Sequence, residues 1–181
     1  MSNTQNAKRI IDEGEKVGVQ LRLFGGVAFK LLCPSALQSP FYRTNSDIDL
    51  MAKRENSKKI DELLRSLDYK PREIFNKLNI GERYIYTGET KIDIFFDKFR
   101  MCHTFDFRDS LLPGVYTLPL TDLILTKLQV IEIAENEYKD LGAAFSNCSL
   151  MALVSDALVK YSIAFFNVSL FSCAIPSIVL H

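Results

Sequence analysis

Three aspartates on apolar segments are the residues of this chain best suited to chemistry. Asp47 and Asp49 lie in the run NSDIDLM, residues 45–51, and Asp93 lies in KIDIFF, residues 91–96. Residues i and i+2 of a strand point to one face, so Asp47 and Asp49 would repel each other side by side. A divalent cation relieves that repulsion, and Mg²⁺ prefers such hard oxygen ligands. A third carboxylate from another strand would allow two metal ions to hold a triphosphate between them.

A glycine pair precedes these carboxylates at a strand end. Gly25 and Gly26 follow an alternating apolar segment, residues 19–23, and open a short helical segment, residues 27–32. Backbone N–H groups without a neighbouring Cβ can approach a phosphate, and a helix N-terminus favours an anion. The pair is neither a Walker A loop nor a G-x-G-x-x-G fingerprint. Alone it indicates only a tight turn, but together with three strand-borne aspartates it is a strong signal.

Hydrophobic periodicity supplies the elements that would position these residues. Apolar spacing predicts helices over 3–17, 27–32, 57–67 and 120–135, and strands over 19–23, 46–53, 83–87 and 91–97. In the second strand Ile48 and Leu50 face away from Asp47 and Asp49. This order predicts an α+β fold, a small mixed β-sheet with helices on one face followed by a helical C-terminal segment. We expect two parts, a catalytic domain over 1–140 and an apolar helical segment over 141–181.

Composition excludes several classes of protein. The 181 residues carry no net charge, so no global basic field favours nonspecific nucleic-acid binding. The N-terminus is polar and lacks the apolar region of a signal peptide. The cysteines form no Cys-x-x-Cys pair, which argues against a zinc site or a disulfide framework and favours a reducing, cytoplasmic compartment. Their positions are Cys33, Cys102, Cys148 and Cys173.

The C-terminal segment is almost free of charge. From Leu141 onward only Asp156 and Lys160 are charged, and Tyr161–Leu180 is long enough to cross a bilayer. That run also contains polar residues and Pro176, and it lacks flanking basic and Trp anchors. We expect it to be largely helical and packed against protein, including a second copy of the chain. A membrane anchor and a tail from an altered reading frame are the alternatives.

At its glycines and aspartates the chain resembles the nucleotidyltransferase superfamily that includes DNA polymerase beta. More narrowly, LFGGVA (23–28), RTNSDIDL (43–50) and KID (91–93) look like the abortive-infection toxin nucleotidyltransferases of bacterial type IV toxin–antitoxin systems. The resemblance covers roughly residues 19–140. It implies transfer of a nucleoside monophosphate from an NTP in the presence of Mg²⁺ or Mn²⁺, and it raises an antitoxin as a partner.

The resemblance also implies roles for individual residues. Gly25 and Gly26 would hold triphosphate oxygens, and Asp47 and Asp49 would bind both metal ions. Asp93 would bind the metal that activates the acceptor hydroxyl and could serve as its base.

Four further residues would bind the nucleotide by the same resemblance. Arg43 and Thr44 precede the carboxylates where the narrower group often has a similar pair, and Ser46 adjoins Asp47. Lys127 matches a helix lysine placed near the triphosphate. A solvated loop arginine and a snorkelling helix lysine are equally compatible with the sequence.

Two other features are open to simpler interpretations. Lys139-Asp140 resembles a pair found after that helix in the group, and a local ion pair is the safer interpretation. His103 is expected to be a loop residue, because no second His lies within metal-ligand spacing.

The apolar tail departs from the charged helical domain usual in the group, which puts acceptor recognition in doubt.

Two function classes remain. The first is a metal-dependent nucleotidyltransferase whose acceptor is tRNA, a protein or a small molecule. The second is a catalytically silent module of the same fold that binds a nucleotide or a partner. All three carboxylates are present, which favours the enzyme. A third class, in which the tail is the main functional surface of an oligomeric or membrane-tethered protein, would be separated from these by sedimentation without detergent.

Overall fold

The fold is built on a five-stranded mixed sheet. The computed structural model describes residues 1–129 and 134–147. The strand order is β1-β2-β5-β4-β3, in which β2 and β5 are parallel and the other neighbouring pairs are antiparallel. The strands are β1 (Leu21–Phe24), β2 (Asp47–Ala52), β3 (Lys70–Pro71), β4 (Arg83–Thr87) and β5 (Lys91–Phe96).

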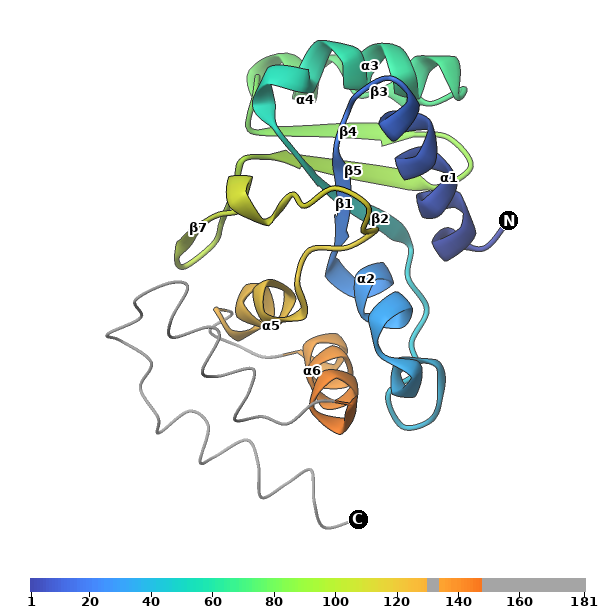
Figure 1. The fold of residues 1–181 in the computed structure, drawn as a ribbon, viewed down its shortest axis with the longest axis vertical. Helices are drawn as coiled ribbons and strands as arrows, with labels where there is room; N and C mark the ends of the chain where they lie inside the picture. The colour runs from blue at the N-terminus through green and yellow to red at the C-terminus, as the bar shows by residue number, and fades with distance from the viewer. Residues whose placement is uncertain (130–133, 148–181) are drawn as a thin grey trace.

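Among the described residues the sheet is accompanied by six α-helices and a small hairpin, arranged as in Figure 1. The helices are α1 (Asn3–Lys16), α2 (Gly25–Leu32), α3 (Ser57–Ser66), α4 (Glu73–Leu78), α5 (Leu120–Leu128) and α6 (Glu135–Asn147). The hairpin pairs β6 (Lys98–Arg100) with β7 (Thr104–Asp106). The predicted α+β class is therefore confirmed.

One face of the sheet carries the hydrophobic core. The register places Leu50 between Leu23 and Ile94, and all three side chains are fully buried. Ile10 of α1 and Ile60 of α3 belong to the same cluster. The alternation of apolar residues in β2 and β5 thus directs one set of side chains under these two helices, and the other set to the opposite face.

The opposite face brings the aspartates together. The register forms a row across four strands in which Asp49 and Asp93 lie between Phe24 and Ile85. Phe24 of this row packs edge to face with Phe95 and Phe99, which also pack against each other, with ring centroids 5.1–5.3 Å apart. The carboxylates therefore lie next to an aromatic wall that the β6–β7 hairpin helps to form.

Helices α2, α5 and α6 pack together at the end of β1 and β2 (Figure 1). The helix predicted over 120–135 ends earlier, at Leu128, and residues 130–133 lie outside the described part. Helix α6 is continuous across residue 140, and the division into two domains stays a prediction. Tyr161–Leu180 also lies outside the described residues. Among the described residues, no helix is long and apolar enough to cross a membrane.

Helix α4 was not expected from the sequence. It is fixed to β4 by Asn76, whose side-chain carbonyl accepts from the Ile85 N–H while its amide donates to the Ile85 carbonyl. In the turn before β4, Gly81 packs against the Arg54 side chain, which a Cβ at this position would overlap. These contacts position β4, and with it Arg83, beside the aspartate face.

Candidate functional site

The site is centred on the three predicted aspartates. Asp49 and Asp93 are register partners on β2 and β5, and Asp47 lies two residues before Asp49 on the same face. One carboxylate oxygen from each lies within 4.8 Å of the others. The predicted clustering is confirmed, because parallel pairing of two apolar strands brings distant positions of the chain to one point.

The cluster is strongly charged, and its electrostatics follow from crowding. Burial, reinforced by the charges of Asp47 and Asp93, raises the pKa of Asp49 to about 7. Lys91 offsets part of this charge, with Nζ 2.9 Å from Asp93 Oδ2 and 3.5 Å from Asp47 Oδ2. The hydrogen bond to Asp93 raises the pKa of Lys91 above its ordinary value, so this ammonium stays charged.

Asp93 is also bound from the other side by Arg83. The Arg83 Nη2 group donates to Asp93 Oδ2 at 2.6 Å, and the guanidinium lies over the Phe95 ring, 4.8 Å from its centroid. Asp93 Oδ1 is buried and has no hydrogen-bond partner among the described residues. Neither Arg83 nor Lys91 was predicted. Lys91 could have been found from its i−2 position on the Asp93 face, and Arg83 from the hairpin register.

These residues fit a hard divalent cation. The donor set is entirely carboxylate oxygen, which suits Mg²⁺ or Mn²⁺ rather than a metal that prefers sulfur or imidazole. The orphaned Asp93 Oδ1 is the atom that most needs a partner, because an unpaired buried acceptor costs stability. Mutual repulsion among the three carboxylates also favours the binding of a cation. The residues that would hold the ion are Asp47, Asp49 and Asp93.

The predicted glycine pair lies directly against the carboxylates. Gly25 has φ +66°, and a Cβ there would overlap the Asp49 carboxylate. A Cβ on Gly26 would overlap the Arg43 guanidinium and the Asn45 side-chain amide. Helix α2 therefore begins beside the aspartates because both residues lack a side chain. No side chain of the described residues caps its first N–H groups, which can therefore receive an anion.

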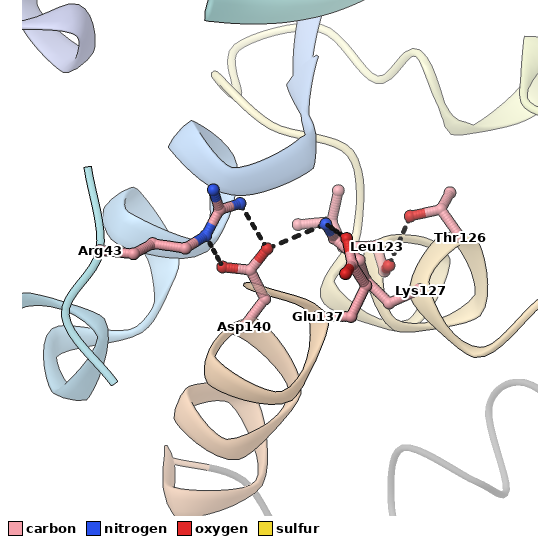
Figure 2. A network of polar contacts seen from close by, with 6 residues as sticks. All are labelled: Arg43, Leu123, Thr126, Lys127, Glu137 and Asp140. Atoms are coloured by element: carbon pink, nitrogen blue, oxygen red, sulfur yellow. Dashed lines mark hydrogen bonds and ion pairs between the residues drawn. The ribbon is translucent and has the colours of Figure 1, made fainter. Parts of the chain in front are cut away.

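The two predicted nucleotide-binding cations share one carboxylate (Figure 2). Arg43 donates from Nε and Nη2 to the two Asp140 oxygens, at 2.9 and 2.7 Å. Lys127 Nζ lies 3.0 Å from Asp140 Oδ2 and 3.4 Å from Glu137 Oε1. Asp140 is only 4% exposed, so this is a buried ion-pair network rather than surface decoration. The charges of Arg43 and Lys127 both act on Asp49.

The Lys139-Asp140 pair is thus only partly as expected. Lys139 does form a local ion pair, with Glu135 at 2.6 Å. Asp140 instead joins α6 to α5 and to the segment before β2. The local sequence does not indicate this bridging role, because Arg43 lies 97 residues away.

The remaining predicted residues are less engaged. Thr44 and Ser46 are exposed on the segment that leads into β2, and their nucleotide-binding role stays a prediction. His103 is exposed in the turn between β6 and β7, where its backbone N–H donates to the Gln129 side chain. The predicted loop histidine is confirmed.

Comparison with known proteins gives the fold by structure and not by sequence. No family model and no curated protein matches this chain. A solution structure of the antibiotic-resistance factor ANT(2'')-Ia aligns with a TM-score of 0.57 and 13% identity, covering 90% of this chain and 94% of that chain. A crystal structure of ANT(2'')-Ia in complex with adenylyl-2''-tobramycin aligns with a TM-score of 0.58 and 12% identity, covering 86% and 95%. At these identities the likeness shows a nucleotidyltransferase-type fold.

Proposed function

We propose that this chain is a metal-dependent nucleotidyltransferase that moves a nucleoside monophosphate from an NTP to a hydroxyl acceptor. The observation that carries the proposal is the convergence of Asp47, Asp49 and Asp93 within 4.8 Å, directly beside the Gly25-Gly26 turn. A carboxylate cluster next to a phosphate-accepting helix N-terminus is the pair of features that nucleotidyl transfer requires. The likeness in fold to ANT(2'')-Ia supports it.

The position of each residue in the site determines the role proposed for it. In the proposed reaction the acceptor oxygen bonds to the α-phosphorus, the bond to pyrophosphate breaks, and pyrophosphate leaves. The backbone N–H groups at Gly25 and Gly26 would hold triphosphate oxygens, and Arg43 and Lys127 would balance their charge. A cation held by the three aspartates supplies charge neutralisation of the phosphates and acidification of the acceptor hydroxyl.

Asp93 is the residue proposed to receive the acceptor proton. Its Oδ1 atom is buried and without a partner among the described residues, whereas Oδ2 is held by Arg83 and Lys91. The two cations fix the carboxylate in one orientation.

The acceptor and the biological setting are finer proposals. ANT(2'')-Ia is seen with adenylyl-2''-tobramycin, which supports a hydroxyl acceptor on a small molecule. The sequence resemblance supports a toxin-type enzyme with an antitoxin partner. In the described part of the chain Cys102 is an exposed free thiol, in keeping with a reducing cytoplasm.

Label transfer tests this function. The protein is incubated with each α-³²P-labelled NTP and Mg²⁺, together with total tRNA, cell protein and tobramycin in separate reactions. We expect label to move to one acceptor class in the wild type and not in Asp93→Asn or in EDTA. Transfer that survives Asp93→Asn would contradict the proposed role of this carboxylate.

One observation favours the silent module as a second candidate. Arg83 and Lys91 already pair with Asp93, so two cations of the chain itself balance part of the site's charge. A silent module would bind Mg²⁺ and NTP without transferring label to any acceptor. An enzyme would show both binding and transfer.

A further inference from the structure

A basic pocket lies next to the aspartates on the β4 side. Its volume is about 520 Å³, within the range of small-ligand sites. Five cationic side chains line it, and only Glu82 and Asp97 oppose them. The cations are Arg54, Arg83, Lys98, Arg100 and Arg108. The lining therefore carries a net charge of +3, in a chain whose total charge is zero.

Part of this positive charge is not paired with a carboxylate of the described residues. Arg108 and Lys98 both face Asp106, at 2.6 and 4.0 Å. Neither Arg54 nor Arg100 has a carboxylate within ion-pair distance in the part of the chain that the structure describes. Arg83 Nε is buried and lacks a hydrogen-bond partner among those same residues. Unpaired arginines around a concave surface attract an anion, and phosphate matches the guanidinium fork.

The pocket adjoins the proposed reaction centre. Phe95 lines the pocket and shares a sheet face with Asp93, two residues along β5 or roughly 7 Å by strand rise. Arg83 belongs to both, because it lines the pocket and donates to Asp93. Gly25 lies at the other end of the carboxylate row, beyond Asp49. The row thus separates the proposed triphosphate side from the basic pocket.

From this placement we propose that the pocket binds a phosphate group of the acceptor, so that the acceptor is a phosphate-bearing molecule with a free hydroxyl. The inference rests on the proposed function, because it assigns the side of the aspartates opposite the triphosphate to the acceptor. A net positive lining repels a polyamine such as tobramycin. It attracts a nucleic-acid strand end or a phosphorylated sugar, which share the same chemistry at the pocket.

Binding can be tested without catalysis. The probes are a labelled single-stranded RNA with a free 3'-hydroxyl, DNA of the same sequence, and ribose 5-phosphate as a competitor, with tobramycin as the cationic comparison. The pocket variant combines Arg54→Glu with Arg100→Glu. Its matched control combines Lys59→Glu with Lys70→Glu, two exposed lysines on α3 and β3, which changes the net charge equally. A double Arg→Lys variant at positions 54 and 100 tests charge with the side-chain length kept.

We expect the pocket variant to weaken binding of a phosphate-bearing probe at least about tenfold and to lower the salt dependence by about one to two charges. The lysine control should change affinity less than about twofold, and the double Arg→Lys variant should recover most of the wild-type affinity. In label transfer the pocket variant should raise the acceptor KM, while the NTP KM stays unchanged. Which of the probes binds, the RNA, the DNA or ribose 5-phosphate, identifies the source of the phosphate.

Three outcomes would overturn the inference: equal loss in the pocket variant and the lysine control, unchanged binding in the pocket variant, or preference of the wild type for tobramycin. Asp49→Asn separates the inference from the proposed function. It should keep probe binding and lose transfer. Pocket-dependent binding in a wild type that transfers no label would contradict the proposed function, while the ligand class of the pocket would stand.

Discussion

Asp49 and Asp93 are direct register partners on the parallel strands β2 and β5, and each also has a charged neighbour on the same face. Parallel pairing fixes their separation through the backbone, so neither can move away without breaking the ladder. The repulsion between them is therefore built into the sheet. The chain tolerates it through Lys91 and Arg83, and a bound cation would relieve it further.

Replacing Asp49 by Asn should stabilise the metal-free protein in a pH-dependent way. The folded pKa of about 7 exceeds the ordinary value of 3.8, so the folded protein binds more protons than the unfolded chain between these values. The contribution of Asp49 is thus fully present below about pH 4 and is lost as the pH rises through about 7. In EDTA the thermal midpoint of Asp49→Asn should exceed that of the wild type at pH 8, and the gap should shrink at pH 5.

The exposed Asp109→Asn is the control, and its difference from the wild type should not vary in this way. A gap for Asp49→Asn that is constant with pH, or largest at pH 5, would show that this carboxylate is not crowded.

Gly25→Ala should destabilise the protein more than Gly18→Ala, although both glycines have a left-handed backbone. Gly25 and Gly18 have similar positive φ values, +66° and +73°, but a Cβ at Gly18 meets nothing within 4 Å. Both substitutions should cost about 1 kcal/mol in left-handed backbone strain. Gly25→Ala should cost about 1–3 kcal/mol more, because the Asp49 carboxylate must move. Urea unfolding measures both, and equal losses would mean that the close approach of Gly25 to Asp49 is unimportant.

Asp140→Asn should destabilise the protein and weaken nucleotide binding together. The change leaves Arg43 and Lys127, which are 14% and 13% exposed, without their shared counter-ion. Breaking a buried ion pair costs about 3 kcal/mol. The misplaced cations should also raise the NTP KM, since both are proposed to face the triphosphate.

Glu135→Gln supplies the control for Asp140→Asn, because it removes only the exposed ion pair with Lys139. Its thermal midpoint and NTP KM should stay near the wild-type values. If Asp140→Asn lowers the midpoint with an unchanged NTP KM, the network supports the fold alone.

Much of the site could be predicted because it depends on local pattern. The alternation of Ile48 and Leu50 with Asp47 and Asp49 fixes which side chains share a face, and a glycine pair after a strand marks a turn. The parallel register that aligns Asp49 with Asp93 was not needed for that prediction, since two apolar strands in one small sheet have few arrangements.

The missed elements lack such a pattern. Helix α4 points the polar Asn76 inward and leaves Ile74 and Leu78 about 80% exposed, the reverse of an amphipathic helix. Its position depends on a hydrogen-bonded contact with Ile85 rather than on hydrophobic periodicity. Arg83 and the bridging role of Asp140 were missed for a similar reason, because their partners are set by hairpin register and by helix packing.

The central claim is that the three aspartates hold a cation on which NTP binding depends, and ligand-linked stability tests it most directly. Thermal midpoints are measured for the wild type and Asp49→Asn in EDTA, in Mg²⁺, and in Mg²⁺ plus each NTP. With Mg²⁺ and NTP at about 100 times Kd, the wild-type midpoint should rise by about 5 °C or more. The Asp49→Asn midpoint should not change. An equal rise in both proteins, or no rise in the wild type with any NTP, would contradict the account.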